Sequence, residues 1–208
     1  MSKTSPERQI VQATGLTILA GMADAVGYIT MGGVFAANMT GNTVLAGIAV
    51  GAHRYTDAWH YFWSLVVFFL GCMLSRGLQR LAHTPIAPLI LEAALLAGVG
   101  FLAIDAETAV LVVAVAMGLQ ASASGPFSTS AVSTVVVTST LTRAADSILD
   151  RLWPGAKSDP PVIAADLRLL SLAWAGYLLG AIAGALIIPL LPYPLLLPAA
   201  LLVIVLLV

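Results

Sequence analysis

Long apolar runs separated by short polar hinges constrain this chain more than any motif does. Of its 208 residues, 60% are hydrophobic and only 9% are charged. A soluble domain carries about 25% charged residues, so this chain has too little polar surface to face water. Because backbone groups in lipid must be hydrogen-bonded internally, such runs predict transmembrane helices. The sequence therefore predicts an all-α fold, a polytopic helical bundle embedded in a lipid bilayer.

Apolar segments can be delimited by glycine, proline and charged residues. They cover about 12–32, 34–52, 60–81, 86–104, 107–124, 128–145, 166–189 and 193–208. The second and the last are short for a span of about 20 residues. We therefore expect six to eight membrane segments in a single domain, residues 1–208, with one polar loop at 146–165.

The positions of lysine and arginine predict the orientation. Eight crossings with the N-terminus inside place seven basic residues in the cytoplasm: Lys3, Arg8, Arg54, Arg143, Arg151, Lys157 and Arg168. Only Arg76 and Arg80 fall outside, which satisfies the positive-inside rule and predicts cytoplasmic termini. This pair would instead mark a cytoplasmic end if the second segment fails to cross.

A weak internal repeat relates the two halves of the chain, 12–104 and 107–208. The stretch "MTGNTVLA" (39–46) aligns with "VTSTLTRA" (137–144). Each follows a helix with a glycine and a polar residue, "GMAD" or "AMGLQ". Each precedes a glycine-containing helix, "FLGCMLSRGL" or "LLGAIAGALI". An even number of crossings in each half would place the halves parallel.

Polar residues interrupt the first two apolar segments. Asp24 lies near the middle of the first, where a carboxylate costs about 2.5–3.5 kcal/mol on insertion scales and usually faces a protein interior or a water-filled cavity. Gly32 and Gly33 predict a break in the chain. Asn38 and Asn42 follow, four residues apart and therefore on one stripe of a helix, with Thr40 between them. These residues predict a proton, cation or solute site.

The second half offers counterparts to these residues. Gln120 takes the place of the acid, Gly125-Pro126 supplies a break, and Thr138 and Thr140 supply hydroxyls. Interrupted segments at matching places in two halves are typical of a transporter's central site. The alternative is a network of interhelical hydrogen bonds that only fixes packing. A transport site predicts that these side chains line a cavity, whereas packing predicts a closed, fully bonded core.

Several other classes of function are disfavoured. His53, His60 and His83 lack a metal-binding motif and a nucleophile partner, so we expect no enzyme, no catalytic residue, no metal and no cofactor. The nine scattered lysines and arginines form no basic patch for nucleic acid. A second buried acid, Glu92, lies near the start of the fourth segment, where we expect it to lie close enough to the interface to reach water.

Small residues recur at four-residue steps, which lets helices approach closely. They include Gly176, Gly180 and Gly184, Gly71 with Ser75, and Gly47 with Gly51. These faces predict helix packing within the chain, and they would equally serve a homodimer.

The stretch "GMADAVGYITMGGVFAANMTGNTVLAG" (21–47) resembles the signature of the YoaK family, the bacterial inner-membrane proteins of domain of unknown function 1275. "AMGLQ", "VVVTSTLTR" and "LLGAIAGA" are similar to later blocks of that family, although Ser139 stands where many relatives have glycine. The resemblance covers nearly the whole chain. It implies an integral inner-membrane protein of one domain, without an established activity.

These observations favour a small secondary transporter or permease that moves a small solute with protons or cations. The predicted site comprises Asp24, Asn38, Thr40, Asn42, Gln120, Thr138 and Thr140. The alternative is a membrane sensor or assembly partner that transports nothing and uses its polar residues only for helix packing.

Overall fold

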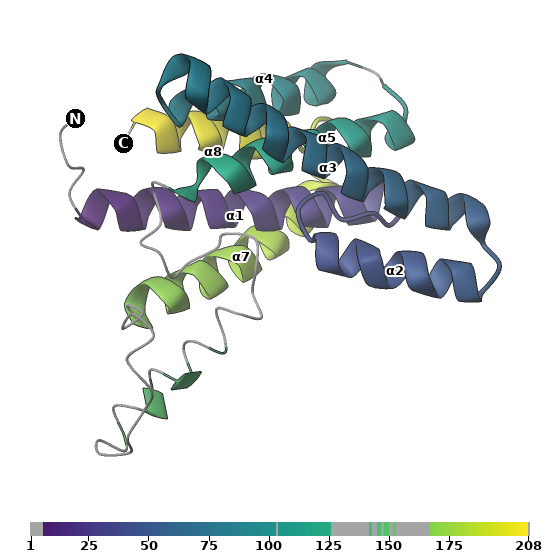
Figure 1. Ribbon diagram of the computed structural model, residues 1–208, viewed down its shortest axis with the longest axis horizontal. Helices are drawn as coiled ribbons and strands as arrows, with labels where there is room; N and C mark the ends of the chain where they lie inside the picture. The colour runs from purple at the N-terminus through teal and green to yellow at the C-terminus, as the bar shows by residue number, and fades with distance from the viewer. Residues whose placement is uncertain are drawn as a thin grey trace.

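The computed structural model describes residues 6–102, 104–125, 142, 145–146, 148–149, 152 and 167–207. Within them the chain is all-helical, as predicted (Figure 1). The helices are α1 (Pro6–Thr30), α2 (Met39–Gly51), α3 (Tyr55–Ala82), α4 (Ile86–Phe101), α5 (Ala106–Ala123), α7 (Leu167–Ile187) and α8 (Leu196–Leu207). The predicted segment 128–145 lies almost entirely outside the described residues.

Three of these helices, α1, α3 and α5, are long and apolar enough to cross a membrane. The shorter apolar helices in the described part of the chain are α2, α4, α8 and the Ser171–Ile187 part of α7. Side chains of α1 and α5 dominate the buried core, whereas α3 exposes large apolar residues such as Phe69, Leu70 and Met73. Because exposed apolar side chains on a long helix suit hydrocarbon rather than water, this distribution fits a bundle whose outer helices face lipid.

Two close helix pairs, α1 with α7 and α3 with α5, form the largest contacts of the fold. Gly176, Gly180 and Gly184 of α7 meet Thr14, Ile18 and Met22 of α1 in that order, so these two helices run parallel. In the second pair Gly71 meets Val115, and the Ser75 hydroxyl donates to the Leu119 carbonyl oxygen over 2.9 Å, so α3 and α5 are also parallel.

The two pairs repeat each other residue by residue. In both, a β-carbon on a glycine would overlap a backbone carbonyl oxygen of the partner helix. The matching contacts are Gly21 with Tyr177 and Gly118 with Phe68, then Gly180 with Ile18 and Gly71 with Val115. Absence of side chains at these positions allows the backbones to approach closely, as in other membrane bundles.

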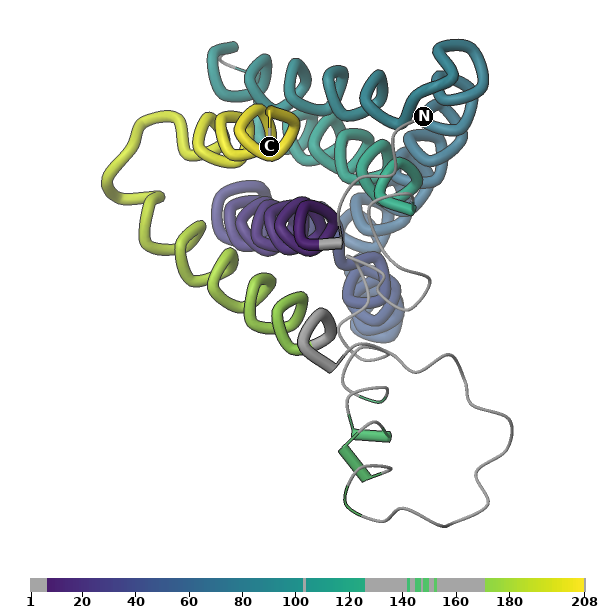
Figure 2. Tube along the Cα trace, turned by 90° about the vertical axis from the view of Figure 1, so that its left-hand side faces the viewer, coloured from purple at the N-terminus to yellow at the C-terminus, as the bar shows by residue number. Residues whose placement is uncertain are grey.

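Helix α8 completes the arrangement by packing against α4 and α1. The start of α8, Leu196, contacts Gly100 at the end of α4, and Val205 near its end contacts Gly15 near the start of α1. Helix α8 is therefore antiparallel to both. Figure 2 views the bundle end-on and shows α8 between α4 and α1, with α5 beside it.

The directions of these helices correct the predicted relation of the halves. Helices α1, α4 and α7 run one way, and α3, α5 and α8 run the other, as the colours in Figure 1 show. Helix α1 thus opposes α5, and the predicted parallel halves are wrong. The reason is α2, which runs in the direction of α1 instead of returning across the bundle and so adds no crossing.

This topology also explains why Arg76 and Arg80 did not fit the predicted cytoplasmic side. Arg8, Arg76 and Arg80, together with the start of α7 at Leu167, lie at the end of the bundle where α1 begins. Arg54 precedes α3 at the opposite end. Helix α8 also ends at the first of these two ends (Figure 1). The basic residues of the described helices therefore gather at the end where α1 begins.

The predicted homodimer faces are largely used within the chain. Gly176, Gly180 and Gly184 pack on α1, and Gly71 packs on α5. In contrast, Gly47 and Gly51 of α2 have no atom within 4 Å of an added β-carbon. Of the glycine faces named above, only that of α2 remains open.

Candidate functional site

The chain reverses direction after α1. Gly32 and Gly33 adopt left-handed backbone angles, with φ of +78° and +75°, which glycine reaches without steric cost. The Gly33 N–H donates to the Tyr28 carbonyl oxygen over 3.1 Å, closing the helix end. The Phe35 ring then stacks on Tyr28, with ring centroids 4.7 Å apart. Residues 31–38, here called the re-entrant stretch, therefore return along α1. The predicted break at Gly32-Gly33 is confirmed.

Asp24 receives this returning segment. Its side chain is buried, with 3% exposure. Oδ1 accepts hydrogen bonds from the N–H groups of Ala37 at 2.6 Å and Asn38 at 3.2 Å, and Oδ2 accepts from the Tyr177 hydroxyl. One carboxyl group thus ties α1, the re-entrant stretch and α7 together at membrane depth. Three donors on one carboxylate compensate for much of the hydration that burial removes.

The two asparagines hold the re-entrant stretch in different ways. Asn38 caps α2, because its Oδ1 accepts the Gly41 N–H over 3.0 Å. Asn42 is fully buried and forms two hydrogen bonds with the Phe35 backbone. Its Oδ1 accepts the Phe35 N–H at 2.9 Å, and its Nδ2 donates to the Phe35 carbonyl oxygen at 2.7 Å. The Asn42 amide also donates to the Ser64 hydroxyl of α3 over 2.9 Å. Asn42 therefore fixes the return of the chain, as the packing alternative predicts.

Part of the predicted site is assembled, and part is not. Asp24, Asn38 and Asn42 come together around the re-entrant stretch. Gln120 is buried but donates to the Leu16 carbonyl oxygen over 3.0 Å, eight residues and about 12 Å along α1 from Asp24. Thr40 is exposed on α2 and contributes nothing to the site. Thr138 and Thr140 lie outside the described residues.

Sequence reasoning missed Tyr177 and the backbone N–H groups of the re-entrant stretch. Tyr177 stands 153 positions from Asp24 in an ordinary glycine-rich helix, so no local pattern pointed to it. The backbone donors follow from the reversal at Gly32-Gly33, which predicted a break but not its direction. The hydrogen-bond partners of Asp24 could not be predicted without knowing the path of the returning chain.

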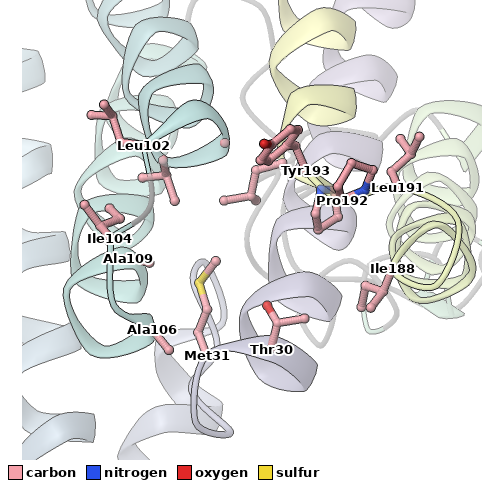
Figure 3. A pocket seen from close by; sticks show the side chains of 14 residues that line it. Thr30, Met31, Leu102, Ile104, Ala106, Ala109, Ile188, Leu191, Pro192 and Tyr193 are labelled. Carbon is pink, nitrogen blue, oxygen red and sulfur yellow. The ribbon is translucent and has the colours of Figure 1, made fainter.

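Two cavities open at the end of the bundle where α1 stops. One, of about 510 Å³, is lined by Thr30 and Met31 together with apolar residues of the α4–α5 and α7–α8 connections (Figure 3). The other, of about 450 Å³, is lined by Gly32, Trp63 and the polar side chains of Asp57, His60 and Glu107. They share Met31 and Ala106. Neither is lined by Asp24, Asn42 or Gln120, so the carboxyl group is closed off from both.

The connection beside these cavities gives a first prediction. Asp105 caps α5, and the Thr108 N–H, 2.9 Å from its Oδ1, holds the pKa of that carboxyl below its usual value. The lowered pKa adds stability above the unfolded pKa of about 3.9, and this stability is lost as the pH falls through the folded pKa. We expect Asp105→Ala to lower the melting temperature at neutral pH, with a smaller difference from wild type at acidic pH.

Asp105→Asn is the matched control, because asparagine caps helices about as well as aspartate but does not titrate. Thermal unfolding in detergent at neutral and acidic pH measures both variants. Asp105→Asn should keep neutral-pH stability and lose part of the acid dependence. Equal melting temperatures for Asp105→Ala and wild type at neutral pH would show that the cap contributes nothing.

Comparisons with known proteins agree with this membrane architecture. A family model described as "Protein of unknown function (DUF1275)" matches residues 12–208. The chain belongs to the DUF1275 family. Its relative in Bacillus subtilis (strain 168), the UPF0700 transmembrane protein YoaK, is 30% identical over 185 residues, covering 84% of this chain and 81% of that protein. No solved structure matches the chain. The sequence-based assignment to this family is thus confirmed. The prediction that the chain is a membrane protein is confirmed as well.

Proposed function

We propose that the protein is a small secondary transporter that moves a small solute with protons, and that Asp24 is the proton acceptor. The observation that carries this proposal is the bonding of Asp24. One carboxyl group at membrane depth holds both an interrupted segment, through Ala37 and Asn38, and α7, through Tyr177. Protonation removes the negative charge that these donors stabilise. The re-entrant stretch is thereby released, so proton binding is coupled to a conformational change.

The opposed directions of the two halves support this proposal. Many transporters consist of inverted repeats with the site at their interface, formed by discontinuous helices near the bilayer midplane. Here α1, α3 and α4 oppose α5, α7 and α8, respectively. Asp24 belongs to the first set and its partner Tyr177 to the second. The α1–turn–α2 segment is the interrupted element.

The cavities provide the outer vestibule in this proposal. The positive-inside rule favours a cytoplasmic location for the end with Arg8, Arg76 and Arg80, in a bacterial inner membrane. The cavities then open to the outside. Thr30, which lines the larger one, is six residues and about 9 Å along α1 from Asp24. The re-entrant stretch lies beside this path, and its release would admit solute towards Asp24.

The alternative is a protein that transports nothing and uses these residues for packing. The closed, fully bonded state of Asn42 favours it for that residue. For Asp24 the alternative makes a different prediction from ours: neutralising the carboxyl group would change stability but not proton movement.

Proton flux into proteoliposomes tests the proposal. Full-length protein is reconstituted with an internal pH-sensitive dye, and a pH gradient is applied with or without a mixture of amino acids, monosaccharides and short carboxylates. We expect wild type to exceed protein-free liposomes and Asp24→Asn to fall to their level. Glu7→Gln, which neutralises an exposed carboxylate on the same helix, should behave as wild type. Thermal unfolding checks that both proteins are folded. Equal flux for folded Asp24→Asn and folded wild type would refute the coupling role.

A further inference from the structure

Glu92 is a second acid inside the bundle that the proposed Asp24 mechanism does not use. It lies on α4 and is fully buried, so the expectation that it reaches water at the interface is wrong. Among the described residues neither of its carboxyl oxygens has a hydrogen-bond partner. Asp24 accepts three hydrogen bonds and Glu92 none, although both are buried acids of the same bundle.

The described residues that surround Glu92 offer no compensating charge. On α4 it belongs to a buried stripe with Leu89, Leu96 and Gly100. Helices α3, α5 and α8 pack against α4. Helix α8 has no ionisable side chain, and α5 has only Glu107, exposed in its first turn. The ionisable groups of α3 are Tyr55, Asp57, His60 and Tyr61 near its start and Cys72, Arg76 and Arg80 in its second half. Both arginines are exposed to the outside of the bundle.

The protonation state of Glu92 follows from this burial. An unpaired ionised carboxylate in a protein interior costs several kcal/mol even after relaxation. A neutral carboxyl group that lacks hydrogen-bond partners costs about 1–3 kcal/mol for each unsatisfied group. The neutral form is therefore the lower in free energy, and Glu92 carries a proton in this conformation.

Other unpartnered oxygen atoms lie at a similar depth. Helix α8 contacts Gly100 at its start and Gly15 nine residues later. Helix α4 is antiparallel to α8, so nine residues back from Gly100 on α4 reach the same depth as nine residues forward on α8. That position is next to Glu92, so Glu92 and Gly15 lie at about the same depth. Gln120 bonds the neighbouring Leu16, and its Oε1 is buried without a partner. The Oε1 atom of Gln12, one turn closer to the N-terminal end, is also unpartnered.

We propose that Glu92 is a second proton-binding site, loaded in this conformation and discharged towards the N-terminal end of the bundle, where the unpartnered oxygen atoms of Gln120 and Gln12 lie. Its use in transport rests on the proposed function. The presence of a proton on Glu92 does not, since it follows from the burial of Glu92 and from its lack of a hydrogen-bond partner among the described residues. The two acids then have different roles: Asp24 holds the re-entrant stretch, whereas Glu92 stores a proton.

Carbodiimide labelling tests the proton on Glu92 without any transport. N,N′-dicyclohexylcarbodiimide is apolar and reacts with protonated carboxyl groups. Full-length protein in detergent is treated with it, digested, and mapped by mass spectrometry. We expect an adduct on Glu92, lost in Glu92→Gln and retained in Glu7→Gln and Asp24→Asn. A wild-type digest in which Glu92 carries no adduct would overturn the proposal, and this readout requires no variant to fold.

Proteoliposome flux separates the two proposals. If Glu92 is labelled but wild type moves no protons above protein-free liposomes, the proton site stands and the transporter proposal falls. If both stand, Glu92→Gln should lose most of the wild-type flux. Wild-type flux in a folded Glu92→Gln protein would remove Glu92 from the proton path.

Discussion

Gly180→Ala should destabilise the protein more than alanine at Gly176 or Gly184, the other two glycines of α7. The new β-carbon would overlap the Ile18 carbonyl oxygen of α1, and the next atoms that it meets also belong to the Ile18 backbone. Overpacking of a core typically costs about 1–3 kcal/mol, and more where nothing flexible can give way. We therefore expect the free energy of unfolding to fall by about 3 kcal/mol or more. Thermal or denaturant unfolding in detergent measures this change.

Gly47→Ala is the matched control, because Gly47 lies in α2 and an added β-carbon meets no atom within 4 Å. Alanine is favoured over glycine inside a helix by about 1 kcal/mol, so this variant should be unchanged or slightly more stable. If Gly180→Ala is as stable as Gly47→Ala, the two backbones do not approach as described. The same variant should impair the site, because Tyr177 precedes Gly180 by less than one turn and its bond to Asp24 depends on that approach.

Composition was sufficient to predict the class of this fold, because few other structures suit a chain that is 60% hydrophobic and 9% charged. Glycine and proline breaks also predicted where most of the described helices begin and end. The direction of α2 could not be predicted. A short apolar segment after a break is compatible with either a crossing or a return, and hydrophobicity does not distinguish them. The return depends on bonds from Asp24 to Ala37 and Asn38, and these are tertiary contacts.

The polar residues were predicted unevenly for the same reason. The cost of a carboxylate in the membrane identified Asp24 as a residue that needs partners. The four-residue spacing of Asn38 and Asn42 suggested one helical stripe, but α2 begins at Met39, so Asn38 is a cap and Asn42 a buried side chain. Thr40 faces away because it stands two residues before Asn42, about 200° around the helix and therefore on the opposite face. Helical periodicity assigns faces only when the helix start is known.

Asn42→Ala is the second large effect that we expect. Asn42 satisfies the N–H and the carbonyl oxygen of Phe35 and also donates to Ser64. Alanine leaves the two Phe35 backbone groups without their side-chain partner, and each unsatisfied buried group costs about 1–3 kcal/mol. A loss of about 2–6 kcal/mol in the free energy of unfolding should follow. Thr40→Ala, at the exposed position two residues earlier, should stay within about 0.5 kcal/mol of wild type.

The same pair of variants decides what Asn42 does. If Asn42 only fixes the re-entrant stretch, proton flux in Asn42→Ala proteoliposomes should fall in proportion to the loss of folded protein. The Ser64 hydroxyl already donates to the Tyr61 carbonyl oxygen over 2.7 Å, so removing Asn42 leaves the α3 side of the contact bonded. Unfolding should therefore begin at residues 31–38, and protease cleavage there should increase before cleavage elsewhere. Unchanged stability with lost flux would instead identify Asn42 as a solute ligand, and the packing role assigned to it here would be wrong.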